Sequence, residues 1–254
     1  MHIYSIVFLM GIIIGSFLNV CIYRIPKNQS IVYPSSHCSS CNRSLQVMDL
    51  IPIFSYFILK GKCRYCRHKI SLRYPMVELL TGIVFVLLLY KYDFSIDLLF
   101  YLILVSTLIC ISFIDYDHQI IPDGLVLLGF AAGLIYKLVL YYFINVPIEF
   151  LNSILGFLVG GGFFLLIAVV SKGGMGGGDI KLIAMLGFWI GWQDVILISF
   201  LAFIIGSIVS IILLITKIKS RKDAIPFGPF IAISSLIVIL YKNYLLVHYM
   251  NLVM

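Results

Sequence analysis

The sequence predicts an all-α polytopic membrane protein of about eight transmembrane helices, with one small loop domain between the first two. Three observations support this prediction. Of the 254 residues, 62% are hydrophobic and only 11% are charged, and the mean hydropathy is +1.10. A soluble domain has too little interior to bury so much apolar surface, so most of it must face lipid. The apolar residues also form separate stretches, with most of the basic residues between them.

Eight apolar stretches follow one another, most of them near the roughly 20 residues that a helix needs to cross about 30 Å of hydrocarbon. They are 4–23, 75–91, 96–114, 124–144, 150–170, 180–193, 195–216 and 227–247. The first has no basic segment and no small-residue cleavage pattern before Arg24, so we expect a retained span rather than a signal peptide. The stretches 75–91 and 180–193 are short for a span, so either one could be tilted, re-entrant or buried against its neighbours.

Glycines in two of these stretches predict close helix packing. Gly156 with Gly160, and Gly187 with Gly191, have the spacing that lets the backbones of membrane helices approach each other. We therefore expect the stretches 150–170 and 180–193 to lie in a packed bundle.

The basic residues predict which side of the membrane each connection faces, because Lys and Arg gather in cytoplasmic connections. Fifteen of the 18 lie in the connections after odd-numbered spans, which are 24–74, 115–123, 171–181 and 217–226. Only Lys91, Lys137 and Lys242 lie on the other side. We expect the odd connections in the cytoplasm and both termini outside. The net charge of +7 is then mainly a topology signal, and nucleic-acid binding is not expected.

The connection 24–74 is large enough to be a structure of its own and carries two Cys-x-x-Cys pairs, Cys38 with Cys41 and Cys63 with Cys66. Two such pairs can close a tetrahedral site of four thiolates around zinc. The alternative is two disulfides, which rarely persist in the reducing cytosol that the charge count predicts. We expect a structural zinc, since four cysteines leave no open position for catalysis, and a loop that depends on it for order.

Most of the eleven acidic residues are expected to be solvated, as they lie near span ends or in loops. This group contains Asp49, Asp93, Asp97, Glu149, Asp194 and Asp223. Glu78 stands near the start of the second span. There we expect its carboxylate to cap the helix N-terminus, where the helix dipole favours negative charge, or to pair with Arg73. A role toward a substrate is the alternative for Glu78.

Asp115, Asp117, Asp123 and Asp179 border the membrane in two connections of the same parity. Asp115 and Asp179 could therefore converge on one face of a bundle. Two adjacent carboxylates cannot both ionise easily, so they would share one proton. One could then activate a water as a base while its protonated partner polarises a peptide carbonyl. Spacing alone leaves the alternative of unrelated loop aspartates open.

One of these acids, Asp179, lies near the end of a glycine-rich run. The run reads Ser171-Lys-Gly-Gly-Met-Gly-Gly-Gly-Asp179-Ile-Lys181. Its five glycines let the backbone approach another group closely at a helix start. The run lacks the Gly-Lys-Ser/Thr of a phosphate loop and the glycine spacing of a dinucleotide fingerprint, so it does not predict nucleotide binding.

Six sequence blocks together closely resemble the type IV prepilin peptidases, in the order typical of that family. They are Gly15-Ser-Phe-Leu-Asn-Val-Cys-Ile-Tyr-Arg-Ile-Pro26, the doubled Cys-x-x-Cys loop, Arg73-Tyr-Pro-Met-Val-Glu-Leu-Leu80, Ile114-Asp-Tyr-Asp-His-Gln-Ile-Ile-Pro-Asp123, Gly176-Gly-Gly-Asp179 and Ile225-Pro-Phe-Gly-Pro229. The Gly-x-Gly-Asp block alone is also found in presenilin-like aspartyl proteases, whereas the ordered set is specific. The resemblance implies a multi-pass aspartic endopeptidase of the bacterial cytoplasmic membrane. Such an enzyme cuts the basic leader from prepilins or pseudopilins at the cytoplasmic face.

The resemblance also implies roles for individual residues. The family's two catalytic aspartates correspond to Asp115 and Asp179. Asp117 and Asp123 are expected to support them, together with Gly176, Gly178 and Lys181. Many members of the family also methylate the new N-terminus with S-adenosylmethionine, and the resemblance implies the same activity here. In the family this activity is associated with the cysteine-bearing N-terminal region. No residue of this sequence identifies the site of the methyl donor.

These expectations divide the chain into residues 1–91, with the metal loop, and residues 92–254, the peptidase core. Prepilin precursors and the lipid bilayer are the expected partners. A proton-coupled transporter using Asp115 and Asp179 is the main alternative, although its acids would lie deeper in the spans. A presenilin-type protease and a zinc-organised scaffold without catalysis are two further alternatives.

Overall fold

The computed structural model of the protein describes residues 2–145, 147, 149–220 and 223–253. All the regular elements in these residues are helices, which confirms the predicted all-α class. The chain divides into two compact units, Met1–Leu102 and Ile103–Met254, and the boundary falls inside helix α4 (Ile96–His118). Each unit is described by itself.

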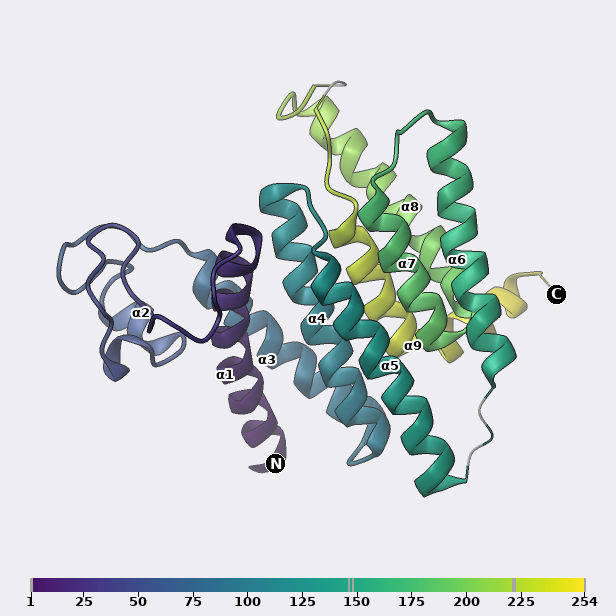
Figure 1. The fold of residues 1–254 in the computed structure, drawn as a ribbon, viewed down its shortest axis with the longest axis horizontal. Helices are drawn as coiled ribbons and strands as arrows, with labels where there is room; N and C mark the ends of the chain where they lie inside the picture. The colour runs from purple at the N-terminus through teal and green to yellow at the C-terminus, as the bar shows by residue number, and fades with distance from the viewer. Residues whose placement is uncertain (1, 146, 148, 221–222, 254) are drawn as a thin grey trace. The chain divides into compact units, whose positions relative to one another are not determined.

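The first unit is built on two helices, α1 (His2–Arg24) and α3 (Arg73–Tyr92), which pack against each other (Figure 1). Glycines bring their backbones into direct contact. A Cβ added at Gly11 would lie 2.7 Å from the Cα of Gly82, and one added at Gly15 would lie 2.7 Å from the Cα of Glu78. Small residues at a helix crossing are typical of membrane helices, because they allow close van der Waals packing.

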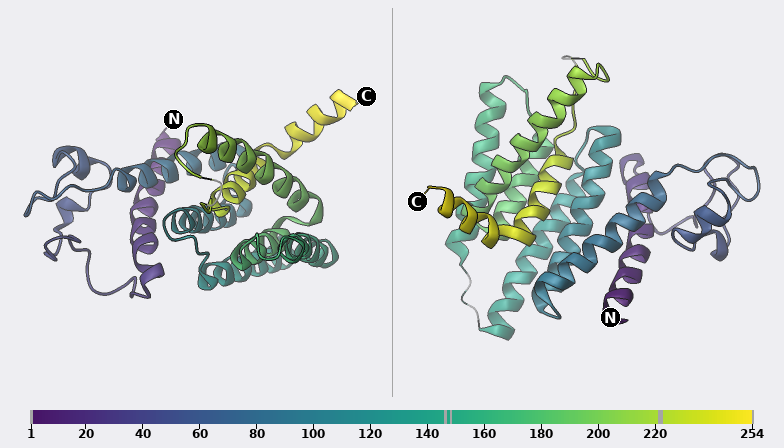
Figure 2. Two further views of the ribbon diagram at one scale, coloured as in Figure 1. Left: turned by 90° about the horizontal axis from the view of Figure 1, so that it is seen from above. Right: turned by 180° about the vertical axis from the view of Figure 1, so that it is seen from behind.

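The segment between α1 and α3 forms a lobe beside these helices (Figure 2). It contains three short helices, η1 (Ile25–Lys27), η2 (Val47–Asp49) and α2 (Phe54–Ile58). Arg24 anchors the start of the lobe: its guanidinium is buried and donates to the carbonyl oxygens of Ser30 at 2.9 Å and Pro34 at 2.7 Å. These bonds satisfy carbonyls in a stretch that has no regular secondary structure to pair them.

The second unit is a helix bundle centred on α7 (Gly177–Ile190) (Figure 1). Helix α7 contacts four other helices of the bundle. Those helices are α5 (Asp123–Ile144), α6 (Phe150–Val170), α8 (Trp192–Ile215) and α9 (Gly228–Val253). Leu182, Ile183, Met185 and Leu186 are all fully buried. A helix that is apolar on every side is stable when neighbouring helices surround it.

Close backbone contacts fix α7 against its neighbours. Gly187 on α7 and Gly156 on α6 leave no room for a side chain on either one, because an added Cβ would collide with the other's carbonyl group. On the α5 side, the indole N–H of Trp189 donates to the carbonyl oxygen of Gly129 at 2.7 Å. The predicted close packing of the stretches 150–170 and 180–193 is thus confirmed.

All eight predicted stretches form helices. Not all of these helices are long and apolar enough to cross a membrane. Among the described residues, six helices meet that criterion: α1, α3, α4, α5, α6 and α8. Helix α7 has 14 residues, and Gly228–Lys242 is also a shorter apolar helix. The protein is therefore a multi-pass membrane protein, and the count of eight spans is not confirmed.

The contact between Gly156 and Gly187 predicts an asymmetric response to added methyl groups. We expect Gly187→Ala to lower the free energy of unfolding by about 1–3 kcal/mol, because the extra carbon forces α6 and α7 apart. Gly162→Ala is the matched control on α6, since an added Cβ there meets nothing within 4 Å. Thermal unfolding in detergent measures both variants, and equal stability of the two would contradict the packing described here.

Candidate active site and metal centre

Two carboxyl groups lie at one end of the second unit. Asp115 is in the last turn of α4, and Asp179 is in the first turn of α7. Asp115 is only 6% exposed, and its Oδ2 accepts a hydrogen bond of 2.8 Å from the backbone N–H of Gly228. Gly228 is the first residue of α9, so this donor is one of the free N–H groups of a helix N-terminus. Such a position favours a negatively charged acceptor.

Aromatic packing holds the Gly228 donor in place. The ring of Phe227 lies 5.2 Å from that of Phe203 on α8 and 6.1 Å from that of Phe164 on α6. A Cβ at Gly228 would lie 2.8 Å from Oδ2 of Asp115, so the close approach requires glycine. Gly228 lies in the block Ile225-Pro-Phe-Gly-Pro229, and the sequence alone predicts no role for it. The available signal was a glycine directly before a proline at the start of an apolar stretch.

Asp179 is positioned by the glycine-rich run, which packs on the connection between α4 and α5. An added Cβ at Gly178 would lie 2.8 Å from the Cβ of Ile121, and one at Gly176 would lie 3.1 Å from Oδ2 of Asp179. A side chain at Gly176 or Gly178 would therefore crowd a neighbouring group, which explains why both positions are glycine. The other oxygen of Asp179, Oδ1, is buried and has no hydrogen-bond partner among the described residues.

The two carboxyl groups also interact electrostatically. Asp179 lies outside the six candidate spans, and burial together with the nearby charge of Asp115 raises its pKa to about 7. A hydrogen bond with the backbone of Gly176 acts in the opposite direction. A carboxyl group with such a pKa holds its proton near neutral pH, so this geometry allows one protonated and one ionised partner.

The other predicted supporting residues join the connections around this pair. Lys181 forms an ion pair of 2.7 Å with Asp123, which links the start of α7 to the start of α5. Both side chains are exposed, so the pair contributes at most about 1 kcal/mol. Gln119 donates to the carbonyl oxygen of Ala224 at 3.2 Å, and Asp117 is exposed.

Two acidic residues of the first unit hold the lobe together. The expectation that Asp49 is solvated is wrong: its side chain is 2% exposed and accepts a bond of 2.6 Å from Arg64. Folding of the loop brings Arg64 onto Asp49, which the sequence could not reveal. Glu78 is buried, and its Oε2 accepts a bond of 2.7 Å from the backbone N–H of Ile53, so it fastens the lobe to α3.

The four cysteines of the lobe converge. The Sγ atoms of Cys38, Cys41, Cys63 and Cys66 all lie within 4.8 Å of one another, and those of Cys38 and Cys66 are 3.8 Å apart. A zinc ion with tetrahedral bonds of about 2.3 Å would set its sulfur ligands about 3.8 Å apart. The cluster therefore fits a structural zinc site.

The two Cys-x-x-Cys turns have the same local structure. In each, the N–H of the first cysteine, Cys38 or Cys63, donates to the carbonyl oxygen five residues later, at 3.0 and 2.8 Å. The residue after the second cysteine is in the left-handed region, with φ of 55° at Asn42 and 60° at Arg67. Each turn thus presents two thiols from one reversal of the chain, and the two turns together supply the four ligands.

Comparisons with known proteins match two parts of the chain to known families and most of its length to named relatives. The model of the bacterial peptidase A24 N-terminal domain matches residues 9–92, and that of the type IV leader peptidase family matches residues 102–211. Three relatives named prepilin leader peptidase/N-methyltransferase come from Pseudomonas putida, Bacillus subtilis and Neisseria gonorrhoeae, at 33%, 34% and 36% identity. The aligned regions cover 92%, 98% and 90% of this chain and 89%, 98% and 87% of theirs. No solved structure matches at a significant level.

The sulfur geometry predicts about one zinc ion per chain in the purified protein. We expect Cys63→Ser combined with Cys66→Ser to remove the metal, because two remaining thiolates cannot complete a tetrahedral site. The lobe should then be cut faster by protease, since metal binding contributes to folding. Cys21→Ser is the control, as this cysteine lies in α1 outside the cluster. Elemental mass spectrometry measures the zinc, and unchanged zinc content in the double variant would contradict the assignment.

Proposed function

The chain belongs to the type IV leader peptidase family, and from that premise we propose that Asp115 and Asp179 are the catalytic pair of a membrane aspartic endopeptidase. The enzyme is a prepilin leader peptidase and N-methyltransferase by its relatives. We propose prepilin or pseudopilin precursors as its substrates. The observation that carries the catalytic assignment is the pair of a buried Asp115, which accepts a hydrogen bond from Gly228, and a half-buried Asp179, whose Oδ1 has no hydrogen-bond partner among the described residues.

The environments of the two acids suggest different roles. The backbone N–H of Gly228 donates to Asp115, which in its ionised form would take a proton from the attacking water. Asp179, with its raised pKa, would hold the proton that polarises the peptide carbonyl. Water then adds to the carbonyl carbon while Asp179 gives its proton to the carbonyl oxygen. The carbon–nitrogen bond breaks as Asp115 passes the proton that it took from water to the leaving amine, and Asp179 takes a proton back from the tetrahedral diol.

The expected substrate fits a site at the end of a helix bundle. A precursor with a basic leader and one apolar helix places its scissile bond where that helix leaves the membrane. We infer from the charge count that this is the cytoplasmic face of the bacterial membrane, with both termini of the enzyme outside. The glycine-rich run before Asp179 would let an extended peptide backbone approach the acids.

The two activities would divide between two parts of the chain, residues 1–91 and residues 92–254. Cys38, Cys41, Cys63 and Cys66 would hold a structural zinc in the first part. S-adenosylmethionine would supply the methyl group for the new N-terminus. A proton-coupled transporter is disfavoured, because Asp115 and Asp179 lie at one end of the bundle and the relatives are named as peptidases.

The catalytic assignment predicts that either single substitution, Asp115→Asn or Asp179→Asn, lowers prepilin cleavage by about 10²–10⁴-fold, because each removes one proton-transfer group. Asp93→Asn, at an exposed residue in the first unit, should change cleavage by a few fold at most. Mass spectrometry of a prepilin peptide incubated with the enzyme in detergent detects the lost leader. Substantial cleavage by the Asp179→Asn variant with normal zinc content would reject the assignment.

The raised pKa of Asp179 predicts a pH dependence with a definite sign. Below pH about 7 this carboxyl keeps its proton, and above it the acid is lost, so kcat/KM should fall as the pH rises from 7 to 9. The measurement is the pH profile of kcat/KM for a prepilin peptide, over a range where the unfolding temperature stays constant. A profile that remains flat up to pH 9 would be inconsistent with Asp179 as the acid.

A further inference from the structure

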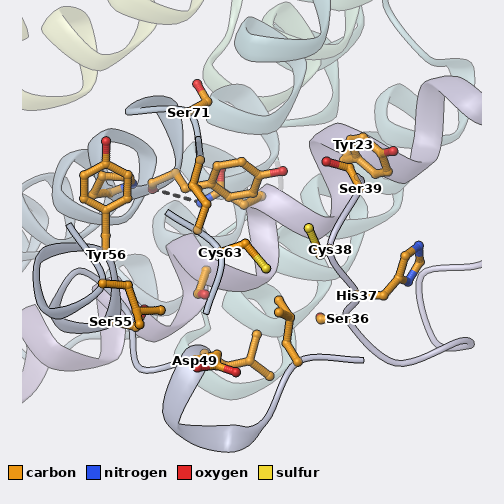
Figure 3. Close-up of a pocket in the computed structure, with 18 of the residues that line it drawn as sticks. Tyr23, Ser36, His37, Cys38, Ser39, Asp49, Ser55, Tyr56, Cys63 and Ser71 are labelled. Atoms are coloured by element: carbon orange, nitrogen blue, oxygen red, sulfur yellow. Dashed lines mark hydrogen bonds between the residues drawn. The ribbon is translucent and has the colours of Figure 1, made fainter. Parts of the chain in front are cut away.

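The first unit contains a cavity of about 490 Å³ that the carboxyl pair of the second unit does not use. Side chains from α1, α2, α3 and both cysteine turns line it, and Figure 3 shows several of them around the space. Pockets of about 300–1,000 Å³ that combine apolar walls with a few buried polar groups are typical small-molecule sites. The cavity therefore has the size of a site for a nucleoside-sized ligand.

A buried amide marks its α1 wall. Asn19 lines the cavity and is only 2% exposed. Its Nδ2 donates to the carbonyl oxygen of Tyr74 at 3.0 Å, whereas its Oδ1 is buried with no hydrogen-bond partner among the described residues. A buried acceptor without a partner is destabilising, and a bound hydroxyl or amino group would relieve that cost.

A buried carboxyl group marks the α3 wall. Glu78 also lines the cavity, is 6% exposed, and accepts a hydrogen bond from the backbone N–H of Ile53. That bond uses one oxygen, Oε2. A cation bound close to this acidic group would favour its ionised form and pair with it.

Tyrosines supply the aromatic part of the lining. Tyr23 comes from α1, Tyr56 from α2 and Tyr74 from α3 (Figure 3 labels the first two). Their rings offer faces on which a planar heterocycle can stack and which attract a cation. The cavity thus combines aromatic faces, an unsatisfied acceptor and an acidic group.

We propose that this cavity is the binding site of the methyl donor S-adenosylmethionine. The inference rests on the N-methyltransferase part of the proposed function. The adenine ring would stack on the tyrosines, a hydroxyl or amino group would donate to Asn19, and the sulfonium would lie toward Glu78. Cys38 and Cys63 form part of the wall, so the metal that orders their turns would also shape the cavity.

Direct binding tests the site in the full-length, zinc-loaded protein in detergent, with S-adenosylmethionine as the titrant in a calorimeter. Ser55 lines the cavity from α2, so Ser55→Trp should fill it and weaken binding at least about tenfold. Phe57 lies on the same short helix, is 68% exposed and does not line the cavity, so Phe57→Trp is the matched control. Wild-type affinity in the Ser55→Trp variant would overturn the proposal.

A second variant tests the charge without altering the shape. Glu78→Gln keeps an oxygen acceptor for the N–H of Ile53 but removes the negative charge. It should weaken S-adenosylmethionine, which carries a sulfonium, at least about tenfold more than S-adenosylhomocysteine, whose sulfur is neutral. Equal losses for both ligands would overturn the placement of the sulfonium at Glu78.

The wild-type protein separates this inference from the catalytic assignment. Leader cleavage is measured on the same preparation that is used for calorimetry. Cleavage without binding of S-adenosylmethionine would overturn the assignment of the cavity alone. Binding without cleavage would contradict the catalytic role of Asp115 and Asp179 alone.

Discussion

The second unit must accommodate two carboxyl groups, one buried and one half-buried, at one end of a helix bundle. Carboxylates in such a place require hydrogen-bond donors, and adjacent ones resist simultaneous ionisation. The end of α4 and the beginnings of α7 and α9 meet this need together: α4 carries Asp115, α7 carries Asp179, and α9 presents the N–H of Gly228 to Asp115. No single helix could provide this arrangement, which is why the polar chemistry depends on how the apolar helices pack.

Small residues and aromatic rings set that packing. Contact of Gly187 with Gly156 places α7 against α6, and the bond from Trp189 to Gly129 places it against α5. The ring of Phe227, held between α6 and α8, sets the position of the following residue at the start of α9. The positions of the two carboxyl groups are therefore determined by contacts deep in the bundle as well as by the helix ends that carry them.

Much of this architecture could be predicted from local patterns in the sequence. Hydropathy located all eight apolar helices, and the Cys-x-x-Cys spacing identified a four-cysteine cluster. Patterns of hydropathy do not distinguish a helix surrounded by protein from one that faces lipid, so the burial of α7 was left open. The bond from Gly228 to Asp115 joins residues 113 apart in sequence, and the brace of Arg64 on Asp49 depends on how the lobe folds. Such long-range contacts leave no periodic signal in the sequence.

Two of the features that hold the lobe between α1 and α3 differ in their chemistry. At its beginning, Arg24 donates to the backbone carbonyl groups of Ser30 and Pro34, which do not titrate. The cysteine turns instead fit a zinc ion, which would be released as acid protonates its thiolate ligands. Mild acidification should therefore unfold the two cysteine turns first. The chain just after α1 should keep its hydrogen bonds with Arg24.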